Sequence, residues 1–252
     1  MTKKEALYNY CLRMADDALI VGHRLSEWCS NGPILEEDLA LTNLSLDMIG
    51  RAQAILTYAA ELKGGNITAD DLAYRRSERE YYNHLLAEQA NGDFAHTIAR
   101  QLFISVLELY FYDALQQSRD TTLAAIGAKT LKEVKYHVRH ASDWTIRLGD
   151  GTEESHKRMQ QAVNDLWMYT GELFEMDNTE DLLLHEGLAV DLAPIKASWQ
   201  KHIKEVLSEA TINTPENGYM QTGGLKGIHT EQLGHILSEM QYLQRAYPDA
   251  KW

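Results

Sequence analysis

The residues of this chain that could do chemistry are acids and histidines spaced along long helical segments. Asp47 lies inside the apolar run LSLDMIG, and Gly50 follows three residues later. An acid and a histidine at positions i and i+3 share one helix face, and a four-helix bundle that carries such pairs inward can hold two iron ions. Glycine has no side chain with which to bind a metal. The pair Asp47–Gly50 therefore has the spacing of a di-iron ligand motif without its histidine.

An acid stands three residues before a histidine at two places, Asp93–His96 and Glu153–His156. Both pairs fall at an expected helix start, where Asp93 serves as an N-cap and Glu153 complements the helix dipole. Neither pair lies in the middle of a long helix facing a core. The sequence therefore predicts no catalytic residue, no bound cofactor and no di-iron site in this chain.

Polar residues nevertheless occur at the depth where a bundle would hold a metal centre. These degenerate-site candidates are Asp47, Gly50, Glu108, Glu133, His137 and His140. Glu133 and His137 are four residues apart and share a helix face, so with His140 they could form a single-metal or acid–base site. The preferred interpretation is a hydrogen-bonded cluster that fills the space of a metal centre, because a buried carboxylate needs partners.

A glycine-rich segment near the C-terminal end, TGGLKGIHTEQLG, leads into an expected helix with Thr230 as its N-cap. Backbone N–H groups and a lysine at a helix start can bind a phosphate or a carboxylate. The candidates for an anion or partner contact are Gly223, Gly224, Lys226 and Gly227. More often such a segment is a glycine-dependent turn before a helix.

Long helices are the elements that would position these residues. Apolar residues recur at three- and four-residue steps, proline occurs only four times, and no stretch alternates apolar and polar residues over strand length. The predicted helices cover 4–30, 38–62, 69–76, 77–89, 94–118, 121–148, 153–175, 179–186, 194–210 and 230–246. Two hairpins of long helices predict an all-α, ferritin-like bundle. We expect a single domain over 1–252, with the core bundle at about 4–148 and additional helices at about 152–252.

Composition and charge exclude several classes of protein. The net charge of −13 argues against nucleic acid and anionic membranes as partners. No run of eighteen apolar residues predicts a membrane span, and no apolar segment follows Lys3 and Lys4 as in a signal peptide. Cys11 and Cys29 lie on one predicted helix, about 27 Å apart along its axis, so they cannot pair. Two free thiols suit the cytoplasm.

Five long segments in the same order resemble the PaaC family, the non-catalytic ferritin-like subunits of bacterial ring-1,2-phenylacetyl-CoA epoxidase. They are HRLSEWC at 23–29, DLALTNLSLDMIGRAQ at 38–53, ANGDFAHTIARQ at 90–101, KEVKYHVRH at 132–140 and TGGLKGIHTEQLGHILSEMQYLQRAYP at 222–248. The resemblance implies a structural subunit of aerobic phenylacetate catabolism that pairs with a PaaA-like catalytic subunit holding the di-iron centre. It also implies a bridging subunit and a reductase in the same complex. The isolated chain could form a homodimer.

Two other functions stay open on the sequence. One is a ferritin-like, metal-dependent oxygenase with an atypical ligand set around Glu133, His137 and Asp47. The other is a binding module that uses the Gly223–Gly227 loop for an anion such as a phosphate of CoA. Iron analysis of the purified chain tests the first, and the effect of Lys226→Glu on CoA binding tests the second.

Overall fold

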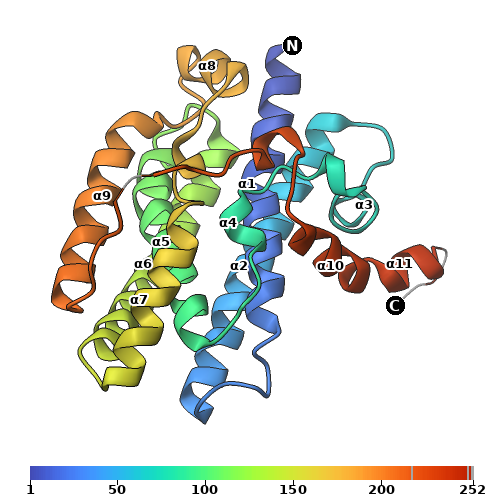
Figure 1. Ribbon diagram of the computed structural model, residues 1–252. Helices are drawn as coiled ribbons and strands as arrows, with labels where there is room; N and C mark the ends of the chain where they lie inside the picture. Colours follow the sequence, from blue (N-terminus) through green and yellow to red (C-terminus); the bar gives the residue numbers. More distant parts are fainter. Residues whose placement is uncertain (217, 249, 251–252) are drawn as a thin grey trace. The chain divides into compact units, whose positions relative to one another are not determined.

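The computed structural model describes residues 1–216, 218–248 and 250, and the chain divides into two compact units. Unit 1 comprises residues 1–90 and 222–252, and unit 2 comprises residues 91–221. Each unit is built on a hairpin of two long helices (Figure 1). The described residues form helices, turns and loops but no strand, which confirms the all-α fold class and is consistent with a ferritin-like helical bundle. That both units belong to one domain stays a prediction.

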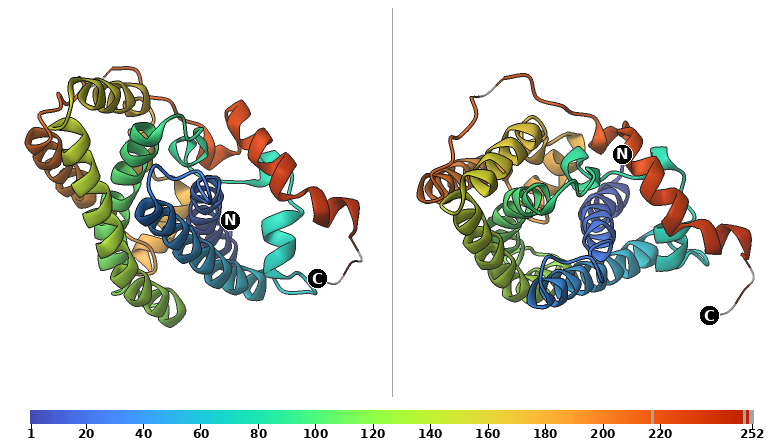
Figure 2. Two further views of the ribbon diagram at one scale, coloured as in Figure 1. Left: turned by 90° about the horizontal axis from the view of Figure 1, so that it is seen from below. Right: turned by 60° about the horizontal axis from the view of Figure 1, so that its bottom comes forward.

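The hairpin of unit 1 consists of α1 (Lys3–Ser26) and α2 (Leu35–Lys63), which lie side by side in both views of Figure 2. A capping box of Thr2 and Glu5 starts α1, and Gly64, with φ of 76°, ends α2. α2 begins at Leu35, about one turn before the predicted start at residue 38.

The first helix ends at Ser26, so the prediction that it reaches residue 30 is wrong. Residues 27–31 form turns instead, and Ser30 takes a positive φ of 67° that continues no α-helix. Cys29 therefore lies outside the helix and is exposed, whereas Cys11 is buried within it. Cys11 and Cys29 form no disulfide with each other, as predicted.

The prediction of one helical segment over 77–89 is also wrong. After α3 (Ala69–Tyr74), the chain forms a 3₁₀ turn η1 (Glu78–Glu80), an extended stretch at 81–84 and a single helical turn α4 (Leu85–Glu88). The stretch is extended because its backbone N–H groups bind the side chains of Asp16 and Asp17 and so cannot join a helix.

The C-terminal segment of the chain belongs to unit 1. It contains a 3₁₀ turn η3 (Gly224–Lys226), α10 (Glu231–Met240) and α11 (Tyr242–Ala246). Thr230 is the N-cap of α10, as predicted, whereas the predicted single helix over 230–246 is divided at Gln241. α10 packs against α1, α4 and η1, so residues far apart in the sequence meet here.

Unit 2 surrounds its hairpin with further helices. Its elements are α5 (Phe94–Leu115), α6 (Thr121–Gly149), α7 (Glu153–Trp167), the 3₁₀ turn η2 (Glu172–Phe174), α8 (Asn178–His185) and α9 (Leu192–Glu209). Asp93 caps α5, as predicted, and Asp120 caps α6. α7 and α9 pack against both α5 and α6, and the indole Nε1 of Trp199 donates to the carbonyl of Phe103 at 2.8 Å. None of the described helices is long and apolar enough to cross a membrane.

Candidate functional site

A fully buried carboxylate, that of Glu88, lies at the centre of a polar cluster in unit 1. Its Oε1 accepts hydrogen bonds from the backbone N–H of Thr230 at 2.6 Å and from the hydroxyl of Thr230 at 2.8 Å. Its Oε2 accepts from Nδ2 of Asn83 at 2.9 Å and lies 2.8 Å from Nδ1 of His229. Four donors on two oxygens compensate the loss of water around a buried charge.

His229 is the positive partner of Glu88. Its Nε2 lies 2.9 Å from the carbonyl oxygen of Tyr81, and its Nδ1 faces the carboxylate. Because a carbonyl and a carboxylate both only accept, both ring nitrogens carry protons and the ring is an imidazolium. Burial alone lowers the pKa of His229, but the hydrogen bond and charge of Glu88 outweigh burial and raise that pKa above its usual value. The pair is a buried, hydrogen-bonded ion pair that joins α4 to the C-terminal segment.

The carboxylate of Glu88 lies at the start of α10, the place that the sequence offers as a candidate for an anion contact. The backbone N–H of Thr230, the N-cap residue, points to this carboxylate. The glycines of the loop have a packing role: a Cβ on Gly224 would collide with the carbonyl oxygen of Asn83, and one on Gly227 with that of Arg79. Lys226 is exposed, and its contact with an external anion or partner stays a prediction.

Two adjacent acids on α1 hold the extended stretch at 81–84. Asp16 is fully buried, forms an ion pair with Arg76 through both of its oxygens, and accepts from the N–H of Tyr82 at 2.9 Å. Asp17 accepts from the N–H of His84 at 2.7 Å and lies 2.7 Å from Nδ1 of that ring. Since backbone N–H groups bound to carboxylates cannot join a helix ladder, this stretch stays extended.

The roles of Asp16, Asp17 and Glu88 were not predicted from the sequence. One signal was available: MADDALIV places two adjacent acids inside an otherwise apolar run of the first helix. Ile20 follows Asp16, and Val21 follows Asp17, at four-residue spacing, so both acids share helix faces with apolar residues. Which donors they meet could not be read locally, because Arg76 is 60 residues away.

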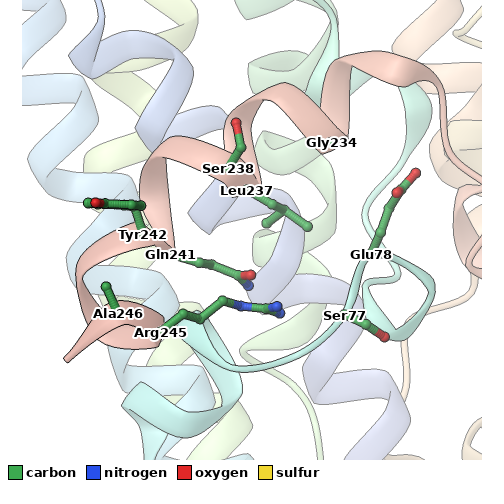
Figure 3. Close-up of a pocket in the computed structure, with 9 residues that line it drawn as sticks. All are labelled: Ser77, Glu78, Gly234, Leu237, Ser238, Gln241, Tyr242, Arg245 and Ala246. Carbon is green, nitrogen blue, oxygen red and sulfur yellow. The ribbon is translucent and has the colours of Figure 1, made fainter. Parts of the chain in front are cut away.

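A groove of about 690 Å³ opens in unit 1 between η1 and the C-terminal helices (Figure 3). Ser77 and Glu78 line one side, and α10 and α11 line the other. Gln241 and Arg245 are fixed there, because both donate to the carbonyl oxygen of Arg76, at 3.0 and 2.8 Å. The wall is mainly apolar with one carboxylate and one guanidinium, which suits packing or binding but supplies no nucleophile–base pair.

The degenerate-site candidates are distributed over both units. α2 of unit 1 carries Asp47 and Gly50, both half-buried. In unit 2, α5 carries the buried Glu108, and α6 carries the half-buried Glu133 with the buried His137 and His140. Nζ of Lys129 lies 3.9 Å from a carboxylate oxygen of Glu133. Within neither unit do three His, Cys, Asp or Glu side chains of the described residues form a group that could hold a metal ion. The metal content of the chain stays a prediction.

Gly50 itself lies beside an exposed side of α2. A Cβ added to Gly50 would meet no atom within 4 Å. The neighbouring residues along that side, Leu39 and Leu46, are 56% and 62% exposed. At the position where a di-iron motif would have its histidine, this chain therefore has an open space on the helix and no donor atom.

Hairpins of long helices without strands in the described residues define an all-α protein consistent with the ferritin-like class. The model of the PaaA_PaaC family, phenylacetic acid catabolic protein, matches residues 1–252, and the chain belongs to this family. It is also 49% identical over 243 residues to the C subunit of 1,2-phenylacetyl-CoA epoxidase from Escherichia coli (strain K12). That alignment covers 96% of this chain and 98% of that protein. The family indicated by the sequence is confirmed.

Proposed function

We propose that this chain is the structural, non-catalytic subunit of a multicomponent phenylacetyl-CoA 1,2-epoxidase in aerobic phenylacetate catabolism. The observation that carries the proposal is the 49% identity to the C subunit of such an epoxidase over nearly the whole of both chains. At this identity and coverage the two chains share their fold. We expect them to share their place in the complex as well.

The chemistry of the described side chains supports a structural role. The buried acids of unit 1 are engaged by donors of the same chain: Glu88 by four and Asp16 by Arg76 and Tyr82. A carboxylate whose lone pairs are taken by fixed donors stabilises the fold, and it is a poor base for a substrate. Their common effect is to fix residues 76–90 and the C-terminal segment onto α1.

The di-iron centre of the reaction is assigned to the PaaA-like catalytic subunit. The residues of this chain do not fit such a centre at α2, because Gly50 offers no donor at the position that would supply an imidazole. The proposal therefore places no step of the oxygenation on this chain. Its contribution is to support the catalytic subunit, together with the bridging subunit and the reductase of the complex.

Reconstitution tests the proposal. The chain and the catalytic subunit are purified separately and together, and iron content and epoxidation of phenylacetyl-CoA are measured for each preparation. We expect the chain alone to be iron-free and inactive, and the pair to be more soluble and more active than the catalytic subunit alone. Near-stoichiometric iron in this chain, or full activity of the catalytic subunit without it, would refute the proposal.

A further inference from the structure

The outer side of α2 carries a line of uncharged residues, most of which are exposed. Leu35, Leu39 and Leu46 are 72%, 56% and 62% exposed. At about 100° per residue these leucines point within roughly 40° of one another, and three later residues continue their line. We call this surface the α2 stripe; it consists of Leu35, Leu39, Leu46, Gly50, Gln53 and Thr57. It extends over about 33 Å of helix.

An exposed stripe of this kind is unusual for a chain that works alone. Burying a leucine side chain stabilises a protein, so three leucines left in water forgo that stabilisation. Large contiguous apolar patches on soluble proteins mark interaction sites more often than chance surface. The stripe therefore indicates a face that another protein covers.

Gly50 gives independent evidence for a close neighbour. Glycine inside a helix is destabilising relative to alanine, so a glycine there usually has a structural role. At Gly22 on α1 the reason is within the chain, because an added Cβ would lie 2.9 Å from Cγ1 of Ile49. At Gly50 nothing lies within 4 Å. A helix of another protein that packs against the α2 stripe can approach most closely where this side chain is missing.

The charges beside the α2 stripe indicate which kind of partner helix would be electrostatically complementary to it. From Leu35 to Gly50, the carboxylates of α2 outside the core are those of Glu36, Asp38 and Asp47, and this part of the helix has no basic residue; Glu37 is buried on another side. The first basic residue of α2, Arg51, is buried. A two-fold contact between α2 stripes of two copies would bring like charges together, which opposes association. The complementary partner is a helix with an apolar seam flanked by lysine or arginine.

We propose that the α2 stripe is the docking surface for a helix of the epoxidase's catalytic subunit, whose apolar seam is flanked by basic side chains. This inference rests on the proposed function, which supplies a partner that must be held in a complex. Gly50 is then the point of closest helix–helix contact. The acidic flank of α2 orients the partner and adds a salt-dependent contribution to its binding.

Binding of the full-length chain to the purified catalytic subunit, measured by calorimetry or surface plasmon resonance, tests the docking surface. Gly50→Leu fills the open space, and we expect roughly ten- to hundredfold weaker binding because the partner helix is held away. The melting temperature of the chain alone should stay equal or rise. Gly234→Leu in α10 is the matched control, since its Cβ would meet only Glu78 Oε2 at 3.9 Å, and binding should be unchanged.

A second pair of variants tests the charge of the partner. Leu46→Lys and Leu46→Glu both remove the apolar contact, but a basic flank on the partner repels the lysine. We expect Leu46→Lys to bind more weakly than Leu46→Glu, and wild-type binding to weaken as salt rises. Equal binding by the two variants, or tighter binding by Leu46→Lys, would contradict a basic-flanked partner.

The remaining outcomes separate this inference from the proposed function. If the wild-type chain does not bind the catalytic subunit, the proposed function fails. If it binds and Gly50→Leu binds equally well, the docking surface is wrong while the function stands. Loss of binding in Gly234→Leu instead would place the interface at the groove of Figure 3. A dimer of the chain alone that Gly50→Leu dissociates would make a second copy the occupant. Each of these last three results overturns the docking surface proposed for α2.

Discussion

α2 and α6 are the second helices of their hairpins, and both are 29 residues long. α6 packs against α5 and is also covered by α7 and α9, whereas α2 packs against α1 with α3 beside it. The side of α6 that stays exposed carries Lys129, Lys132, Lys135 and Arg139, and the corresponding side of α2 carries leucines. In unit 2, further helices of the same unit cover the hairpin. In unit 1, the side of α2 that carries Leu35, Leu39 and Leu46 remains exposed.

The glycines within these two helices show the same difference. A Cβ on Gly127 of α6 would lie 2.8 Å from the backbone N of Gln116, so the close approach of α5 and α6 requires that glycine. A Cβ on Gly50 of α2 would meet nothing within 4 Å. Gly127 is therefore required for helix packing within unit 2, whereas Gly50 is not required for packing within unit 1.

Each unit also has a histidine held between two acceptors, but at different depths. His229 and Glu88 have side chains that are 0% exposed. In unit 2, Nδ1 of His96 lies 2.8 Å from Asp93 and its Nε2 lies 3.0 Å from Asp165, with side chains 24%, 31% and 49% exposed. Water screens the second cluster and not the first, so the two should differ greatly in their contribution to stability.

The largest expected effect is that of removing the buried carboxylate. Glu88→Ala leaves an imidazolium and several donors of unit 1 without their acceptor, and we expect the free energy of unfolding to fall by about 3–5 kcal/mol. Denaturant unfolding followed by circular dichroism measures this change. Asp165→Ala, in the exposed cluster, is the control and should cost at most about 1 kcal/mol. Similar losses for both variants would mean that depth does not separate the two clusters.

The next effect is that of the glycine in the covered hairpin. Gly127→Ala forces α5 and α6 apart at the backbone of Gln116, and we expect a loss of about 1–3 kcal/mol in the free energy of unfolding. The loss should appear as a lower melting temperature. An unchanged melting temperature would show that the hairpin of unit 2 adjusts without cost.

The opposite sign is expected in the open hairpin. Gly50→Ala adds a better helix former at a position with free space, so the chain alone should gain about 0.5–1 kcal/mol. Calorimetric melting of the isolated chain measures the gain. A loss instead would indicate that Gly50 already packs against something within the chain, and would weaken the contrast with Gly127.

The smallest effect is a dependence on pH. The pKa of His229 is raised in the folded state, so its contribution is fully present below the unfolded value of about 6.5 and is lost as pH rises through the raised value. We therefore expect the stability difference between wild type and His229→Gln to be larger at low pH and to shrink as the pH is raised.

The half-buried His96 provides the comparison for that experiment. Burial lowers the pKa of His96, but the hydrogen bonds and charges of Asp93 and Asp165 raise it overall, so the sign is the same. The difference between wild type and His96→Gln should shrink over a similar pH range but be smaller, because solvent screens the cluster. A difference that grows with pH at His229 would contradict the assigned imidazolium.

Local patterns predicted where the long helices lie and two of their caps, but the helix expected over 153–175 ends at Trp167 and the one expected over 4–30 ends at Ser26. Asp93 and Thr230 are N-caps as expected, because a cap needs only a short side chain and its next few residues. The helix expected over 77–89 failed for the opposite reason. Its amides bind Asp16 and Asp17, more than sixty residues earlier, and no window of sequence contains both partners.

The candidate site was predicted in composition but not in its contacts. The absence of a histidine at position 50 is visible in the sequence, and so is the glycine-rich loop at 223–227. That the start of α10 receives the carboxylate of Glu88, 142 residues away in the chain, is visible only in the structure. The sequence likewise shows the leucines of α2 but not which of them remain exposed.

For this protein, the sequence alone determined the all-helical class, the family and the missing ligand at Gly50, since each depends on residue type and short-range spacing. Tertiary structure decided which acids are buried, which glycines are packed and which side of α2 remains uncovered. The physical reason is that burial and hydrogen bonding depend on segments from distant parts of the chain that come together in the fold. Local periodicity does not specify which distant segments come into contact.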